Sequence, residues 1–290
     1  MSTLHSRRAA RWLLSPSVAL LLLWMVVPLG MTLYFSTLHY NLLMPGATPF
    51  VGLENYYWFF KDPAFTTSIF NTLLLVGGVL CITVTGGVAF ALLLEQPIFG
   101  KGMARILVIS PFFVMPTVSA LVWKNMFFNP VNGLFAYIAK LFGLPAFDFL
   151  THTPLLSIVI IVAWQWLPFA TLIFVTSLQS LDSDQIEAAD MDGAGRLQKF
   201  YYIVLPHLVR SITVVVLIQT IFLLSVFAEL LVTTNGGPGV ASTNLTYLVY
   251  VRSLLQFDVG AGAAGGIIAI ILANIVAFFL IRIIGKNLET

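Results

Sequence analysis

Apolar residues come in long runs along this chain, and short polar segments separate the runs. A helix that crosses a membrane needs about 20 predominantly apolar residues. The pattern therefore predicts an all-α integral membrane protein in which residues 1–290 form a single domain of six transmembrane helices. The expected spans cover approximately Trp12 to Leu38, Ser68 to Leu94, Ala104 to Phe128, Pro154 to Leu178, Val209 to Val232 and Ala263 to Ile284.

The composition supports this class and excludes others. Hydrophobic residues make up 59% of the chain and charged residues 9%, whereas about 25% of the residues of a soluble domain are charged. The apolar composition leads us to expect membrane lipid among the partners. A formal net charge of +2 is too small to indicate nucleic-acid binding, so we expect no nucleic acid among them. Cys81 is the only cysteine, which excludes an intrachain disulfide.

The first apolar run follows a group of arginines, as in a secretory signal peptide. The run is too long for a signal peptide, and no small-residue cleavage site precedes the polar segment near His39, so we expect an uncleaved helix. Lysine and arginine concentrate in cytoplasmic segments of membrane proteins. With both termini cytoplasmic, the inner segments hold Arg7, Arg8, Arg11, Lys101, Arg105, Arg196, Lys199, Arg210, Arg282 and Lys286, and the outer ones hold only Lys61, Lys124, Lys140 and Arg252.

The polar connection between the fourth and fifth spans, residues 183–206, is the longest cytoplasmic segment. Asp184 and Glu187 have the spacing of a capping box, which predicts a short helix from Ser183 to Asp192. Gly193 and Gly195 then supply a stop or bend. A second short amphipathic helix is expected from Arg196 to Leu205, with Pro206 at the turn into the fifth span.

The first of these two helices is small and acidic. Ile186, Ala188 and Ala189 form an apolar knob beside Glu187, Asp190 and Asp192. Such a helix could lie on the membrane surface. Membrane-surface helices are usually basic, and anionic lipid would repel this one. Docking into a cytoplasmic protein is therefore the favoured interpretation.

The same segment resembles the EAA loop of permease subunits of bacterial ATP-binding cassette importers. In that loop Glu-Ala-Ala is followed by three residues, Gly, nine residues, Ile, one residue and Leu-Pro. The matching positions here are Glu187, Ala188, Ala189, Gly193, Ile203, Leu205 and Pro206.

The resemblance implies the type I importer permease fold and a bacterial inner-membrane location. It also implies that residues 183–195, which include Ala194, form a coupling helix on the nucleotide-binding subunit. The implied partners are a homologous second permease, two ATP-binding cassette subunits and an extracytoplasmic solute-binding protein.

The similarity extends over most of the chain. The segments "VGLENYYWFFKDPAFTTSIFNTL", "PFFVMPTVSALVWKNMFFNPVNG" and "TTNGGPG" resemble the first permease subunit of carbohydrate importers of the maltose and glycerol-phosphate type. Within that group, "SPFFVMPTVSALVWKNM" and "VAWQWLPFATLIF" are most similar to the sorbitol and mannitol branch. A polyol or sugar substrate is the implication.

The chain lacks the phosphate-binding loop sequence by which many ATPases bind ATP. Neither Gly100-Lys101 nor Gly285-Lys286 belongs to a complete phosphate-binding loop. No nucleophile, base or metal-ligand pattern accompanies the scattered histidines. We therefore expect no enzyme activity and no cofactor on this chain, with ATP and Mg²⁺ bound by the partner ATPase.

An importer of a neutral polyol needs hydrogen-bonding groups and aromatic faces on helices that line a cavity. Polar residues within the spans are the candidates for this path. They are Asn71, Asn125, Trp164, Gln165, Gln219, Ser225, Glu229 and Asn274.

Glu229 stands out because an acid within a span is a functional hypothesis by default. It could instead reach the outer headgroups or pair with the second permease.

Two other classes of protein remain as alternatives. In an ion-coupled secondary transporter of a small polar solute, Glu229 would be the ion site. A membrane enzyme or assembly scaffold has less support, because no catalytic group converges in the sequence. Transport by the purified chain alone would favour the first alternative, and substrate turnover the second.

Overall fold

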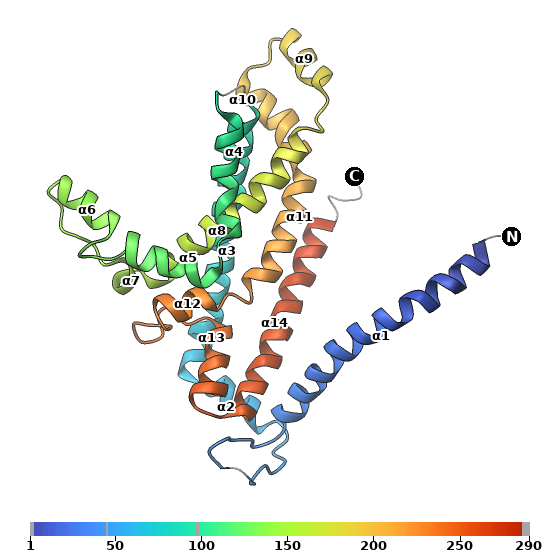
Figure 1. The fold of residues 1–290 in the computed structure, drawn as a ribbon, viewed down its shortest axis with the longest axis vertical. Helices are drawn as coiled ribbons and strands as arrows, with labels where there is room; N and C mark the ends of the chain where they lie inside the picture. Colours follow the sequence, from blue (N-terminus) through green and yellow to red (C-terminus); the bar gives the residue numbers. More distant parts are fainter. Residues whose placement is uncertain (1–2, 45, 97–98, 286–290) are drawn as a thin grey trace. The chain divides into compact units, whose positions relative to one another are not determined.

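The computed structural model describes residues 3–44, 46–96 and 99–285, with side chains from residue 12 to residue 282 apart from the gaps. Throughout this part the regular elements are helices, and extended pairing is limited to two isolated bridges. Five helices are long and apolar enough to cross a membrane, and one bent helix pair brings the number to six. The predicted all-α membrane class is confirmed (Figure 1).

The long helices begin and end near the predicted limits for the first, second, fourth and sixth spans. The fourth has the same bounds as predicted, and the others extend several residues further at one end or both. They are α1 (Thr3–Ser36), α3 (Pro63–Glu95), α8 (Pro154–Leu178) and α14 (Val259–Gly285).

The third span is not the single helix that the sequence predicted. Helix α4 (Lys101–Ile109) continues into the turn η1 (Ser110–Phe113), and then the chain bends by 107° into α5 (Pro116–Val122) and η2 (Trp123–Phe127). The bend has a local cause. Proline disfavours helical backbone in the residue before it, and Met115 has the extended angles φ −59° and ψ 139°.

The fifth span is broken as well. Helix α11 (Leu205–Leu223) ends before residues 224–227, and the short α12 (Ala228–Thr233) follows. Two side chains of the next segment stabilise the break. Asn244 donates to the carbonyl of Val226 (2.6 Å), and Thr246 donates to the carbonyl of Leu224 (3.1 Å). The free carbonyl groups therefore have partners, as non-helical backbone at membrane depth requires.

The expected turn at Pro206 is also absent. Residues 196–223 form one helix, made of α10 (Arg196–Lys199), the π-helical turn η3 (Phe200–Val204) and α11. A proline inside a helix leaves one carbonyl without its amide donor. The wider π turn lies immediately before Pro206, where Leu205 N–H bonds to the carbonyl of Phe200. Pro206 is thereby accommodated in a continuous helix.

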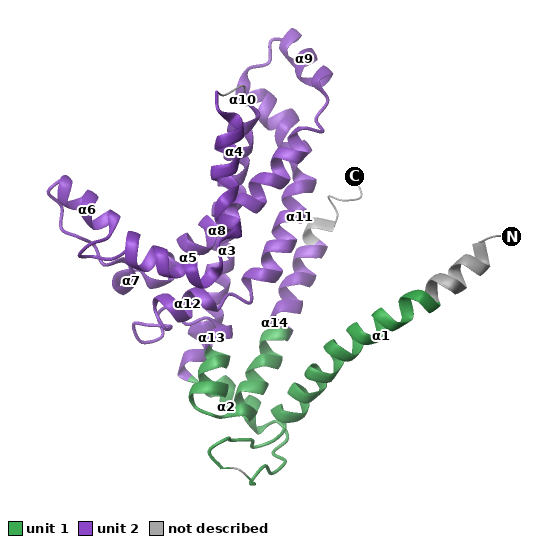
Figure 2. Ribbon diagram, in the orientation of Figure 1, with its two compact units in different colours: residues 1–62, 248–270 green, residues 63–247, 271–290 purple. Residues whose placement is uncertain are grey.

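Contacts divide the chain into two compact units (Figure 2). Unit 1 comprises residues 1–62 and 248–270, and unit 2 comprises residues 63–247 and 271–290. The single permease domain over residues 1–290 stays a prediction. Of the residues used to orient the chain, Arg7, Arg8, Arg11 and Lys286 have side chains outside the described part.

In unit 1, an ion pair and an asparagine connect distant segments. Arg252 Nε donates to Asp62 Oδ2 at 2.8 Å. Asn55, on the short helix α2 (Glu54–Lys61), donates to the carbonyls of Ser36 and Leu38, both at 2.8 Å. Unit 1 thus holds its loops together by polar contacts that the hydrophobic pattern does not reveal.

In unit 2, the core lies where α3, α8 and α11 pack together. Phe174 and Ala170 of α8 are fully buried against α3. A Cβ atom at Gly87 of α3 would lie 2.9 Å from the Cβ of Ala170. Glycine there lets the two helices approach closely, in the way that small residues do in membrane helix pairs.

Candidate translocation cavity and coupling elbow

The bend of the third span and the break of the fifth meet at one cavity of unit 2, with a volume of about 330 Å³. Volumes of roughly 300–1,000 Å³ are usual for small-molecule sites. Its walls come from η1, α5, α8, α11 and α12, and they are Phe112, Val114, Pro116, Gln165, Trp166, Phe169, Ile218, Phe222 and Glu229.

Four aromatic rings form much of this wall. Phe112 stacks on Phe169 at a centroid distance of 5.9 Å, and both contact Trp166 edge to face at 5.9 Å. The ring of Phe222 lies 5.3 Å from that of Trp166. Aromatic faces of this kind offer apolar surface to the C–H faces of a sugar while the ring edges stay fixed by their neighbours.

Two polar side chains are in the same cavity. Gln165 donates from Nε2 to the carbonyl of Val114 at 2.6 Å, at the bend of the third span. Its Oε1 is buried and has no hydrogen-bond partner. Glu229 is 5% exposed and lies in the first turn of α12. An unpaired amide oxygen and a carboxylate can both accept hydrogen bonds from hydroxyl groups.

Helix α12 is held in place from the opposite side. Lys124 of η2 donates to the carbonyl of Val232 near the C-terminus of α12 at 2.9 Å. The hydroxyl of Thr233 donates to the carbonyl of Glu229 at 2.5 Å. The backbone that carries the carboxylate is therefore fixed, and a group placed against it meets a preorganised acceptor.

Of the eight polar candidates for the substrate path, Gln165 and Glu229 line this cavity, and the other six lie elsewhere. Asn71 donates to the carbonyls of Ala241 and Thr243 at 3.1 and 2.9 Å, so it holds a loop to α3. Gln219 is fully buried; it accepts a bond from Thr83 (2.7 Å) and donates to the carbonyl of Trp166 (3.2 Å). These two amides join helices and do not line the cavity.

Three more candidates lie elsewhere. Asn125 and Ser225 are exposed, and each bonds to a carbonyl of its own segment. Trp164 packs edge to face on Trp123 at 5.8 Å, within an aromatic cluster at the other side of α8. Of the two tryptophans in this span, the structure places Trp166 in the cavity.

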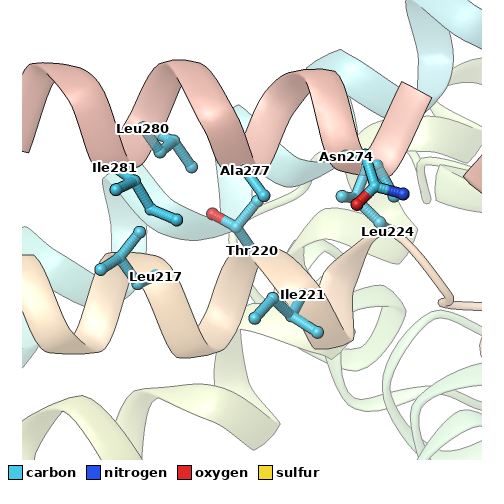
Figure 3. A pocket seen from close by; sticks show the side chains of 9 residues that line it. Leu217, Thr220, Ile221, Leu224, Asn274, Ala277, Leu280 and Ile281 are labelled. Carbon is cyan, nitrogen blue, oxygen red and sulfur yellow. The ribbon is translucent and has the colours of Figure 1, made fainter. Parts of the chain in front are cut away.

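Asn274 lines a different feature, a groove of about 400 Å³ between α11 and α14 in unit 2 (Figure 3). The other lining residues are apolar or small apart from Thr220, whose hydroxyl bonds to its own helix at the carbonyl of Val216 (2.7 Å). A groove with so few polar groups suits an apolar occupant better than a polyhydroxylated one.

The cytoplasmic connection forms a defined elbow, which we call the coupling elbow (residues 182–199). Helix α9 (Ser183–Met191) starts at Asp182, whose carboxylate accepts from the N–H of Asp184 at 3.0 Å. The N-cap is therefore Asp182, and the predicted cap at Asp184 is wrong by two residues. The acid still lies at the positive end of the helix dipole, where it is stabilising.

Helix α9 ends at the glycine that the sequence singled out. Gly193 has φ +76°, and the N–H groups of Gly193 and Ala194 bond to the carbonyls of Asp190 (3.1 Å) and Ala189 (2.9 Å). This is a Schellman motif. Gly195 then begins α10 as its N-cap, and its N–H bonds to Gln198 at 2.7 Å.

One ion pair closes the coupling elbow. Lys199 Nζ lies 2.5 Å from Asp190 Oδ1 and connects α9 to α10. None of the residues of α9 is buried; Glu187 and Ala188 are exposed, and Ile186 and Ala189 are half-buried. Met191 is 90% exposed. The elbow is thus a short, rigid, projecting helix at the end of unit 2 that is remote from α12 (Figure 1).

Sequence reasoning missed most of the aromatic cavity wall. Phe112, Phe169 and Phe222 are ordinary apolar residues within spans, and their pattern gives no sign that they face a cavity. One signal was available. Pro116 and the polar Gln165 belong to the two segments that "SPFFVMPTVSALVWKNM" and "VAWQWLPFATLIF" single out, and the cavity lies between those segments.

Comparison with known proteins gave consistent results. The profile of the family described as "Binding-protein-dependent transport system inner membrane component" matches residues 12–290. The chain is 35% identical to a probable ABC transporter permease protein, y4oQ, of Sinorhizobium fredii, over 87% of this chain and 82% of that protein. It is 33% identical to the trehalose/maltose transport system permease protein MalF of Thermococcus litoralis, over 89% and 87%.

Solved structures show the same fold. A chain of a bacterial ABC transporter involved in the import of the acidic polysaccharide alginate superposes with a TM-score of 0.80 at 23% identity, covering 98% of both chains. A chain of the MetNI methionine ABC transporter in an inward-facing conformation gives a TM-score of 0.53 at 14% identity over 78% of this chain. The type I importer permease fold is confirmed.

Proposed function

Because the chain belongs to the family of inner-membrane components of binding-protein-dependent transport systems, we propose that it is the permease subunit of an ATP-driven importer of a neutral sugar or polyol. The proposed complex contains a homologous second permease, two ATPase subunits that bind ATP and Mg²⁺, and an extracytoplasmic solute-binding protein. Both termini and the coupling elbow are placed in the cytoplasm, since the inner segments then carry most of the Lys and Arg residues.

The projecting α9 is the single observation that carries the coupling role. Its ends are fixed by the Asp182 cap and the Gly193 motif, and the Asp190–Lys199 pair holds it against α10. Because α10 continues without interruption into α11, a push on α9 reaches the helix whose far end lines the cavity. Closure of the ATPase dimer would in this way open the cavity to the outside.

The residues that line the cavity favour a neutral substrate over an anionic one. Among the described residues that line the cavity, Glu229 is the only ionisable one, and none is a lysine, arginine or histidine. A phosphate or carboxylate would find no cation in this lining, whereas hydroxyl groups can donate to Glu229 and to the unpaired oxygen of Gln165. Sorbitol, mannitol and neutral disaccharides such as trehalose all have the required chemistry.

The relatives are named for different substrates. One relative is named for trehalose and maltose, and another, UgpA of Agrobacterium fabrum, for sn-glycerol-3-phosphate. These names include both neutral and anionic cargo. Membership of the family disfavours the ion-coupled carrier, because its members work with a binding protein.

The test uses the assembled complex in liposomes, with ATP inside and the cognate binding protein outside. Uptake of labelled mannitol, sorbitol and trehalose is compared with uptake of glycerol 3-phosphate. We expect ATP-dependent uptake of a neutral compound and none of the anion. Glu229→Gln should lower uptake of the neutral compound, because it replaces one of the two acceptor groups in the cavity, whereas Glu54→Gln, at an exposed carboxylate on α2, should leave uptake unchanged. Efficient uptake of the anion by the unaltered complex would exclude the neutral-substrate proposal.

A further inference from the structure

Gln219 of α11 joins three helices of unit 2 at one buried point. It is 0% exposed, and so is Thr83 on α3. The Thr83 hydroxyl donates to Gln219 Oε1 at 2.7 Å, and Gln219 Nε2 donates to the carbonyl of Trp166 on α8 at 3.2 Å. Side chains of these types form hydrogen bonds across membrane helices. The amide therefore ties α3, α8 and α11 to one another at the level of Trp166.

The carbonyl that accepts from Gln219 belongs to a residue of the cavity wall. The Trp166 ring lines the cavity, and it lies 5.3 Å from the ring of Phe222, which is on α11 one turn after Gln219. Ile218, the residue before Gln219, lines the cavity as well. Gln219 thus holds the backbone of one wall residue from the same turn of α11 that supplies two others.

The turn of α8 around Trp166 has a weakened hydrogen-bond ladder. Pro168 lies inside α8 and has no backbone N–H, so the carbonyl of Trp164, four residues earlier, lacks its helical donor. A helix bends most readily at such a turn. A donor from a neighbouring helix therefore influences the position of this turn more than it would in a regular helix.

Packing alone does not require an amide at position 219. A buried polar group is costly unless it is hydrogen-bonded, and apolar replacement of both partners of a hydrogen bond can be nearly neutral for stability. What the amide adds is direction, because a hydrogen bond weakens steeply as its angle departs from linear. The bond to the Trp166 carbonyl therefore holds α11 and α8 in one register, which an apolar contact would not do.

We propose that Gln219 is a positioning residue that makes the Trp166 wall of the cavity move with α11. This rests on the proposed function, in which closure of the ATPase dimer acts through α9 and α10 on α11. Displacement of α11 pulls on the Trp166 carbonyl through the Gln219 amide, and the Thr83 hydroxyl keeps that amide oriented. Hydrogen-bond networks of this kind carry coupling between distant sites. The cavity thereby changes shape together with the helix that receives the push.

The test compares solute uptake with ATP hydrolysis in liposomes that contain the assembled complex, with ATP inside and the solute-binding protein outside. Gln219→Met keeps the length of the side chain and removes the amide. We expect uptake of labelled mannitol, sorbitol or trehalose per ATP hydrolysed to fall at least ~3-fold, while hydrolysis is retained. The bond from α11 to the Trp166 carbonyl is lost in this variant, so the motor turns over without moving the wall.

Thr220→Val is the matched control on the same helix. Thr220 is the next residue and is 1% exposed, but its hydroxyl bonds within its own helix, to the carbonyl of Val216 at 2.7 Å. Loss of this hydroxyl should leave uptake per ATP unchanged. The comparison distinguishes a bond between helices from a buried polar group as such.

A second pair of variants separates positioning from folding. Thr83→Val removes the donor that orients the Gln219 amide and should lower uptake per ATP in the same direction. The double variant Thr83→Val/Gln219→Met leaves neither partner of that bond unpaired, so it should be at least as stable to heat as Gln219→Met. Its uptake per ATP should nevertheless stay low, because the bond to the Trp166 carbonyl is still missing.

An unchanged ratio of uptake to hydrolysis in Gln219→Met would overturn the proposal. A parallel fall of uptake and hydrolysis, or a double variant that recovers the ratio together with stability, would also overturn it, because the amide would then act through stability alone. If Gln219→Met does not assemble, the ratio measured for Thr83→Val decides in the same way. Absence of ATP-driven uptake by the unaltered complex would contradict the proposed function, whereas normal uptake by that complex with an unchanged ratio in the variants contradicts this inference alone.

Discussion

At the scale of single residues, Gly193 ends the proposed coupling helix α9 with a backbone conformation that favours glycine. Its φ of +76° costs an ordinary L-residue about 1–2 kcal/mol, although a Cβ atom there would meet no neighbour within 4 Å. We expect Gly193→Val to abolish uptake while membrane insertion is retained, because the Schellman motif that ends α9 would be lost. Gly193→Asn is the matched control, since asparagine tolerates left-handed angles.

The measurement for this pair is ATP-driven uptake together with the amount of chain in the membrane. Normal uptake by Gly193→Val would count heavily against the coupling role. Equal loss in the valine and asparagine variants would indicate that side-chain volume at the subunit contact matters, and backbone strain does not.

Trp164 and Trp166 allow a second comparison, because two residues of one type on one helix have different surroundings. Trp166→Ala removes a cavity wall, so uptake should fall by about 10-fold or more, the scale of lost pocket contacts, together with a loss of stability from its ring contacts with Phe112, Phe169 and Phe222. Trp164→Ala empties part of the aromatic cluster with Trp123 and should destabilise by about 3–5 kcal/mol. Thermal denaturation and uptake are measured on both; a reversed pattern would contradict the assigned cavity.

The sequence identifies which span residues carry hydrogen-bonding groups, but not the direction in which each of these side chains points. Gln165 and Glu229 do lie in the cavity, whereas Asn71 and Gln219 bond to neighbouring helices. A buried amide within a span needs partners in either case. The sequence cannot distinguish a partner in the protein from a partner in the solute, because that depends on how the helices are rotated about their axes.

At the scale of elements, the break between α11 and α12 depends on one buried asparagine. Asn244 is 1% exposed, donates to the carbonyl of Val226 and accepts from the N–H of Tyr247 at 2.8 Å. Asn244→Ala removes both of these hydrogen bonds, and the loss of a hydrogen bond to a buried group costs about 1–3 kcal/mol. We expect a clearly lower melting temperature and reduced uptake, because α12 carries Glu229.

Asn125→Ala is the control for this prediction. Asn125 is exposed and bonds only to a carbonyl one turn away, that of Leu121 at 3.0 Å, so its loss should change stability by less than about 0.5 kcal/mol. If the two variants unfold at the same temperature, the break does not depend on Asn244.

The element limits show where hydrophobic periodicity stops being informative. The span from Pro154 to Leu178 was predicted residue for residue, because one polar turn bounds each end. The bent third span and the broken fifth span were predicted as straight helices. Proline alone could not have warned of this, since Pro28 and Pro168 lie inside unbroken helices. At the break of the fifth span, the decisive contact, that of Asn244 with Val226, comes from another segment.

At the scale of the whole molecule, much of the apolar surface needs partners outside the chain. The membrane-crossing part of α1, residues 12–36, has no buried residues in its most hydrophobic window. The exposed α9 and the exposed residues Tyr137 and Leu141 of α6 (Leu134–Leu141) add to this surface. A chain with these features is built for assembly in lipid with other subunits, which agrees with its family.

The last prediction separates an importer subunit from a solitary carrier. We expect vesicles that contain only the purified chain to take up no polyol or sugar under a proton or sodium gradient. The ATPase subunits that would act on the coupling elbow are absent from these vesicles. Addition of the second permease, the ATPase subunits and the binding protein should restore uptake that stops when ATP is withheld. The measurement is radiolabelled uptake, with Glu229→Gln included in both preparations. Gradient-driven uptake by the chain alone that disappears in Glu229→Gln would identify an ion site and reject the importer mechanism.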